Sequence, residues 1–132
     1  MANLILPAKL ENLEKMFAFI HQAAASQGFD QEKSNKIQLA CEEALVNVIN
    51  YAYSGKIGDL EIICENKEKG LEIQIIDCGV AFDPLSLASP DINAPIEERR
   101  VGGLGVFLMR KIMDEVTYQR IGEHNILKLV KY

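Results

Sequence analysis

The chain has 132 residues, of which 48 % are hydrophobic and 25 % charged, a balance typical of a globular domain rather than a disordered segment. A net charge of −5 argues against nucleic-acid binding through bulk electrostatics, and three cysteines without a CxxC pair argue against a disulfide framework or a zinc site. The length suits a single domain over residues 1–132. Because neither a signal peptide nor a membrane-spanning run is visible, we expect this domain in the reducing cytoplasm, with no membrane partner.

The first half of the chain predicts a short strand followed by two helices. Residues 3–6 fit a strand, and residues 8–27 repeat apolar side chains at helical spacing. Gly28 is placed to end that helix. Asp30 is placed to cap a second helix, which runs to about Tyr53.

The second half predicts two hairpins separated by a long loop and a helix. The expected strands are 60–64 and 71–75, then 116–120 and 126–130, with a loop over 79–103 and a helix over 104–113. A loop of this length in a compact domain is usually functional. The order of elements predicts an α/β (α+β) two-layer sandwich, in which one mixed, mostly antiparallel sheet carries three helices on one face.

The second helix carries two polar bands, although a surface helix needs only one. Gln38 and Glu42 form one band, and Glu43, Asn47 and Asn50 belong to the other. Glu43 and Asn47 are four residues apart, so their side chains lie one above the other. A carboxylate can accept a proton from a hydroxyl substrate, and a neutral amide can ligate Mg²⁺. Hydrogen bonding to neighbouring backbone is an equally good explanation of this pattern.

A second motif, Asp77-Cys78-Gly79-Val80-Ala81, directly follows a predicted strand. The Asp77 carboxylate would readily accept a hydrogen bond from an exocyclic amine such as that of adenine. The small residues Gly79 and Ala81 would let a flat ring approach the backbone. An ordinary turn at the end of a strand explains Asp and Gly equally well.

A third motif, Gly102-Gly103-Leu104-Gly105, opens the predicted third helix. Backbone N–H groups at a helix N-terminus attract phosphate, and glycine allows close approach. The motif is neither a P-loop nor a good dinucleotide fingerprint. Taken alone it is better explained as a flexible loop joining a helix. Arg99 and Arg100, just before it, could clamp phosphate, although exposed loop arginines are usually unspecific.

Taken in order, the three motifs resemble the nucleotide-binding motifs of the superfamily that contains DNA gyrase, the ninety-kilodalton heat-shock chaperone and sensor histidine kinases. Within it, the stretches 42–47 and 103–116 are similar to those of bacterial anti-sigma-factor serine/threonine kinases. The likeness spans nearly the whole chain.

The resemblance implies ATP and Mg²⁺ as cofactors and a role for each motif. It makes Glu43 the general base that activates a partner serine, Asn47 the Mg²⁺ ligand, and Asp77 the adenine-binding carboxylate. The supporting residues that it implies are Gly79 and Ala81 beside adenine, Gly103 and Gly105 at the phosphates, and a lid over residues 84–101.

The chain also departs from the family. Many relatives carry a Thr in the final hairpin that holds adenine through water, and residues 123–127 contain none. Asn125 is a candidate replacement. Ala81 stands where many members have Gly, and the lid is only loosely similar.

The resemblance implies a serine/threonine protein kinase that phosphorylates a small anti-anti-sigma protein and sequesters a sigma factor. Homodimers are common in the family, but no coiled-coil heptad here predicts one. The alternative is an ATP-dependent binding switch without kinase activity, against which the retained Glu43 argues. A detached histidine-kinase domain is disfavoured, because His21 is more simply explained as an ordinary helix residue than as a phospho-acceptor.

Overall fold

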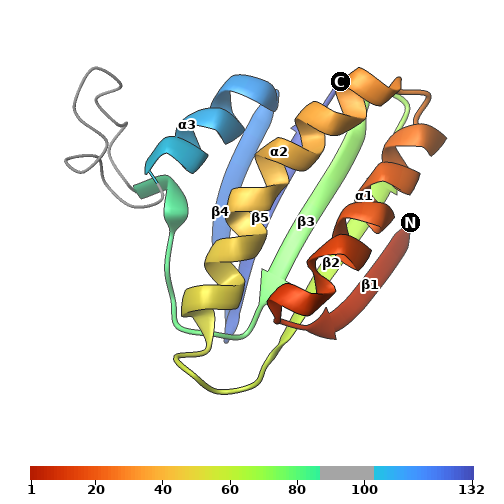
Figure 1. Ribbon diagram of the computed structural model, residues 1–132. Helices are drawn as coiled ribbons and strands as arrows, with labels where there is room; N and C mark the ends of the chain where they lie inside the picture. Colours follow the sequence, from red (N-terminus) through yellow and green to blue (C-terminus); the bar gives the residue numbers. More distant parts are fainter. Residues whose placement is uncertain (87–102) are drawn as a thin grey trace.

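The structure is a computed structural model that describes residues 1–86 and 103–132, with side chains described at 1–86 and 105–132. In these ranges, five strands form one sheet, and three α-helices lie side by side on one face of it (Figure 1). The elements are β1 Ala2–Pro7, α1 Leu13–Ser26, α2 Gln31–Asn47, β2 Asp59–Asn66, β3 Leu71–Asp77, α3 Gly103–Ile112, β4 Glu115–Ile121 and β5 His124–Lys131.

The strand order is β1-β2-β3-β5-β4, and all four pairings are antiparallel. The two-layer sandwich with three helices on one face is therefore confirmed, whereas the expectation of a mixed sheet is wrong for the described residues. Two helices separate β1 from β2, so the chain returns antiparallel. One helix separates β3 from β4, which would favour a parallel pair, but β5 lies between them and pairs antiparallel with both.

The ends of the first two helices follow the local chemistry expected of them. Gly28 follows α1 with a φ of +90°, the left-handed conformation that glycine tolerates. The Asp30 side chain accepts a hydrogen bond of 2.8 Å from the Lys33 N–H and caps α2. The start of α1 was predicted too early, because a 3₁₀ turn over Leu10–Asn12 precedes the helix.

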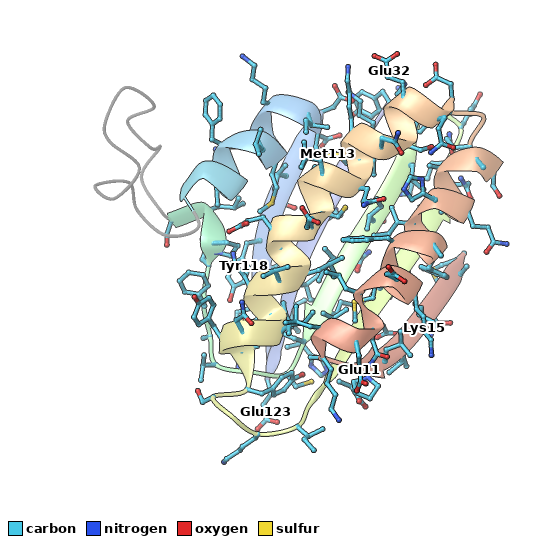
Figure 2. All side chains as sticks on the ribbon, viewed as in Figure 1. Glu11, Lys15, Glu32, Met113, Tyr118 and Glu123 are labelled. Carbon is cyan, nitrogen blue, oxygen red and sulfur yellow. The ribbon has the colours of Figure 1, made fainter. Side chains whose placement is uncertain are left out.

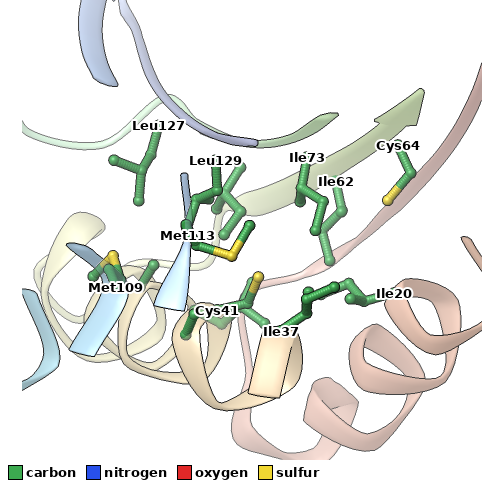
Figure 3. Packing of buried hydrophobic residues seen from close by; sticks show 14 of the residues in the cluster. Ile20, Ile37, Cys41, Ile62, Cys64, Ile73, Met109, Met113, Leu127 and Leu129 are labelled. Atoms are coloured by element: carbon green, nitrogen blue, oxygen red, sulfur yellow. The ribbon is translucent and has the colours of Figure 1, made fainter. Parts of the chain in front are cut away.

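The core lies between the helices and the inner face of the sheet. Ile20, Ile37 and Cys41 point from the helices toward strand residues such as Ile62 and Ile73 (Figure 3). No helix in the described ranges is long and apolar enough to cross a membrane.

Two of the three cysteines belong to this core. Cys41 and Cys64 are buried and free, as expected of small hydrophobic residues, and burial raises the pKa of Cys64 to about 12. Cys78 is exposed. It lies just beyond the end of β3, where the strand pattern no longer turns it inward.

The outer face of the sheet carries a nearly buried carboxylate, Glu72. Its Oε1 lies 3.1 Å from Nζ of Lys67 and 3.8 Å from Nζ of Lys128, and its Oε2 accepts from Gln74. Burial raises the pKa of Glu72, but the hydrogen bonds and the two lysine charges outweigh burial, so the net pKa lies below its usual value.

The replacement Glu72→Gln should destabilise the fold at neutral pH by about 1 kcal/mol, since the lysine ends are half exposed and screened. A carboxylate whose pKa is lowered by folding contributes stability above its unfolded pKa and loses it as the pH falls through the folded pKa. Urea unfolding should therefore show a larger difference from wild type at pH 7 than near pH 3, which is about one unit below the usual glutamate pKa. The control is Glu68→Gln in the exposed turn, and an equal deficit at both pH values would contradict the assignment.

Candidate functional site

A pocket of about 570 Å³ opens where the end of α2 faces the ends of β3 and β5, within the size range of small-molecule sites. Tyr118 of β4 forms part of its wall (Figure 2). The lining is mostly apolar with a few polar groups, and consists of Ala44, Asn47, Val48, Tyr51, Ala52, Ile75, Asp77, Val80, Ala81, Phe82, Pro84, Tyr118, Asn125 and Leu127.

The helical wall of the pocket is irregular. Beyond Asn47, the chain continues as one π-helical turn over Val48–Ala52, where an unbroken α-helix was expected. Single π turns inside α-helices are frequently found at functional sites. Three residues of this turn, Val48, Tyr51 and Ala52, line the pocket.

The segment after β3 packs directly on the end of this π turn. The Val80 N–H donates to the Ala52 carbonyl at 2.9 Å. A Cβ atom at Gly79 would lie 2.1 Å from the same carbonyl oxygen, so a side chain there would force the two backbones apart. Gly79 itself is not among the lining residues, whereas Ala81 is. Gly79 thus permits close approach of protein backbone and shapes the pocket from behind.

Tyr53 also holds the segment that follows β3, through hydrogen bonds of its hydroxyl group. The Tyr53 hydroxyl accepts from the Cys78 N–H at 2.9 Å and donates to the Asp59 carbonyl. Its ring occupies the space where a side chain at Gly58 would lie, 2.2 Å from the nearest ring carbon. Burial is the main reason why the pKa of Tyr53 is raised. The end of β3 is therefore fixed to the end of the helix at several points.

Asp77 ends β3 and is buried, with 5 % of its surface exposed. Its Oδ1 accepts from the Gly79 N–H and from Nδ2 of Asn125, both at 2.9 Å. No hydrogen bond from a described residue reaches Oδ2, yet no buried side-chain oxygen or nitrogen in this part of the chain lacks a partner. Asp77 lines the pocket, and Oδ2 is the carboxylate oxygen that can accept a hydrogen bond from a ligand there.

Asn125 lies directly opposite Asp77 in the pairing of β3 with β5. Besides Asp77, its amide donates to the Val80 carbonyl at 2.8 Å, and its Oδ1 accepts from the Tyr118 hydroxyl at 2.5 Å. Asn125 is 6 % exposed and lines the pocket. Asn125, the candidate replacement for the family Thr, is thus bound to Asp77.

The residue pair on α2 is divided between the pocket and its border. Asn47 lines the pocket, whereas Glu43, one turn earlier, does not. Glu43 is half-buried against α3, and a Cβ atom at Gly105 would lie 1.7 Å from its Cγ. Gly105 lies in the first turn of α3, where the helix dipole favours a nearby carboxylate. Asn50 is exposed and does not line the pocket.

Several of the predicted residues lie wholly or partly outside the described part of the chain. Arg99, Arg100 and Gly102 lie outside the described residues, and Gly103 and Leu104 are described only as the backbone that begins α3. Residues 84–86 form a short 3₁₀ turn, and the rest of the expected lid is not described. Over residues 1–86 and 105–132, no three His, Cys, Asp or Glu side chains lie together as a metal-binding group.

Sequence reasoning missed the aromatic part of the lining, which is formed by Tyr51, Phe82 and Tyr118. For Tyr51 a signal was present, because it follows Asn47 by four residues. It is 57 % exposed, and Phe82 is 48 % exposed, so both present ring surface that a ligand would cover. Tyr118 carried no local signal, since only strand pairing brings it to the pocket.

Comparison with known proteins agrees with this geometry. Residues 6–131 match the model of the histidine kinase-like ATPase domain family. The chain belongs to this family. It is also 33 % identical over 115 residues to the serine-protein kinase RsbW of Bacillus cereus strain G9842, covering 84 % of this chain and 72 % of that protein.

Two further relatives have the same coverage. They are the serine-protein kinase RsbW of Bacillus cereus strain B4264, at 33 % identity, and that of Bacillus mycoides strain KBAB4, at 31 %. These likenesses confirm the resemblance to the serine/threonine kinases of the family. They also support the prediction that this ATPase-type domain is a protein kinase.

The contact between Glu43 and Gly105 gives a test of how the two helices are held together. Gly105→Ala should lower the free energy of unfolding by about 1–3 kcal/mol, despite the better helix propensity of alanine, because the new methyl group overlaps Glu43. The measurement is urea unfolding of the wild type, Glu43→Gly, Gly105→Ala and the double variant. The cost of Gly105→Ala should shrink in the Glu43→Gly background, and an equal cost in both backgrounds would contradict the contact.

Proposed function

We propose that this domain uses ATP and Mg²⁺ to phosphorylate a serine of a small anti-anti-sigma-type protein, and that it regulates a sigma factor by sequestering it. The observation that carries the proposal is the pocket itself, in which Oδ2 of Asp77 and the Asn47 amide open into one apolar space in a chain of a kinase family. We further propose that residues 1–132 act as one cytoplasmic ATP-binding domain.

The Asp77 end of the pocket suits the base of ATP. Oδ2 can accept a hydrogen bond from the exocyclic amine of adenine, and Ala81 adds no bulk beside it. Val48 and Leu127 provide apolar walls for a flat ring, and Tyr51 and Phe82 expose aromatic surface at the rim. Asn47, a polar lining residue on α2, is then available for the phosphates of that nucleotide.

The Asn47 end suits the phosphates and Mg²⁺. No described residue hydrogen-bonds the Asn47 side chain, so its oxygen is available as a neutral ligand, and Mg²⁺ commonly takes its remaining ligands from phosphate oxygens and water. When bound, the ion would neutralise charge on the phosphates. We propose that the nucleotide is also contacted by further residues, which are Asn50, Arg99, Arg100, Gly102, Gly103, Leu104 and Gly105.

Glu43 is the proposed general base. A partner serine would attack the γ-phosphorus of ATP, forming the new oxygen–phosphorus bond while the bond to the β,γ-bridging oxygen breaks and ADP leaves. The serine proton passes to the Glu43 carboxylate and then to solvent. Its place beside the first turn of α3, one turn from Asn47, supports this role, since backbone N–H groups of that turn would face the same phosphates.

The partners rest on the family, and a second copy of the chain is included among them. Sedimentation that gives only monomer at micromolar concentration would remove the dimer from the proposal. The alternative function is an ATP-dependent binding switch, in which the partner is bound but no phosphate is transferred.

Asp77→Asn tests the base site. The new amide oxygen can still accept from Gly79 and Asn125, so the fold is kept while an N–H₂ group replaces Oδ2 in the pocket. ATP affinity should fall at least about tenfold, because a donor would meet the adenine amine. Calorimetric titration with Mg·ATP measures it, with Asp59→Asn as the matched exposed control. Unchanged affinity would remove Asp77 from the site.

Glu43→Gln tests the proposed base. The variant keeps the shape of the side chain against Gly105, so Mg·ATP affinity should stay within about twofold of wild type, while phosphoryl transfer falls at least about a hundredfold. The assay uses γ-labelled ATP and anti-anti-sigma-class proteins of the same organism, with Glu42→Gln as the neighbouring control. Equal loss of binding and transfer would make Glu43 structural, and binding of a partner by the wild type without transfer would favour the switch.

A further inference from the structure

A buried amide lies behind the carboxylate at the base of the pocket. Nδ2 of Asn125 has two protons, one of which is donated to Oδ1 of Asp77 and the other to the Val80 carbonyl. Its Oδ1 accepts from the Tyr118 hydroxyl. Both donors of this amide are therefore used by protein groups, and Asn125 has none left for a ligand.

The chemistry of its neighbours fixes the orientation of this amide. If the amide were turned over, its oxygen would face a carboxylate oxygen and a carbonyl oxygen, two acceptors without a proton between them. The Tyr118 hydroxyl stabilises the observed orientation by donating to the oxygen. A buried polar network is stable only when each member has its partner, and this one is complete.

The amide in turn determines what Asp77 offers to the pocket. Two donors, Nδ2 of Asn125 and the Gly79 N–H, both point at Oδ1 and hold the plane of the Asp77 carboxylate. Oδ2 is left as a pure acceptor. A base with an amino group at this place can donate a hydrogen bond to Oδ2. A base with a carbonyl oxygen there would place a second hydrogen-bond acceptor against Oδ2.

We propose that Asn125 and Tyr118 are positioning residues that act through Asp77, and that together they set the preference of the pocket for an amino-purine over a keto-purine nucleotide. This inference rests on the proposed function, because it requires that a nucleotide occupies the pocket. It gives Asn125 a role different from that of a residue that holds the base through its own hydroxyl, since both amide protons of Asn125 are donated to protein groups.

The first test replaces the amide by a second carboxylate. In Asn125→Asp, two carboxylates face each other and must share a proton, so Asp77 is correctly held only while that proton is bound. Calorimetric Kd values for Mg·ATP and Mg·GTP are measured from about pH 6 to about pH 8. Asn35→Asp, an exposed change of equal charge on α2, is the control, and protonation of the nucleotide itself affects all variants alike.

We expect Asn125→Asp to bind ATP at least about tenfold more weakly than Asn35→Asp near pH 8 and to recover as the pH falls. The ratio of its Kd for Mg·GTP to its Kd for Mg·ATP should be smaller near pH 8 than that of Asn35→Asp. A residue that serves only the fold would change stability without this pH dependence. The same Kd values and the same pH profile in both variants would overturn the inference.

The second test removes only the hydroxyl that holds the amide. Tyr118→Phe leaves the ring in the wall but frees the Asn125 oxygen, and should narrow the ATP/GTP preference severalfold. Tyr132→Phe, which loses a hydroxyl bonded to Glu115 away from the pocket, is the control. This pair decides the question if Asn125→Asp does not fold, and an unchanged preference in Tyr118→Phe would then overturn the inference.

Nucleotide binding by the wild type distinguishes a failure of the proposed function from a failure of this inference alone. If the wild type binds neither nucleotide at millimolar concentration, the proposed function and this inference both fail. If the wild type and Asn35→Asp prefer ATP while the variants at positions 125 and 118 behave like them, the ATP site stands and only the positioning role is lost.

Discussion

The pocket depends on one physical constraint, which is that a carboxylate is buried at the end of a central strand and must be compensated there. Asp77 has two donors at Oδ1, and each of them belongs to a piece of chain that then has little freedom. The Gly79 N–H brings the next segment back over the strand end, where it meets the Ala52 carbonyl. Asn125 ties β5 to the same point. The two hydrogen bonds to this carboxylate thus hold the end of β3, the segment that follows it and β5 together at the pocket.

Two glycines that were predicted to serve the ligand allow close packing within the protein itself. Gly79 allows the segment after β3 to rest on the π turn, and Gly105 allows α3 to rest on Glu43. In both cases a side chain would separate elements that carry functional groups. The motif glycines can therefore be needed for nucleotide chemistry without touching the nucleotide, because they set the distance between the groups that do.

Much of the fold could be predicted from local chemistry, and much of the site could not. Apolar spacing located the helices and strands, and Gly28 and Asp30 marked helix ends, because these effects act within a few residues. The insertion of β5 between β3 and β4 is a long-range choice that periodicity does not encode. The same choice brings Tyr118 and Asn125 to Asp77, so the network behind Asp77 was beyond sequence reasoning even though each residue was visible.

The placement of the cysteines gives this chain a single addressable thiol. Cys41 and Cys64 are shielded in the core, where burial keeps them protonated, whereas Cys78 is exposed next to Asp77 with its N–H held by Tyr53. Cys78 does not line the pocket. A thiol-reactive fluorophore would therefore attach at one position, at the margin of the base site rather than inside it. The native sequence already contains the attachment point for an optical reporter of pocket occupancy, without any cysteine having to be added or removed.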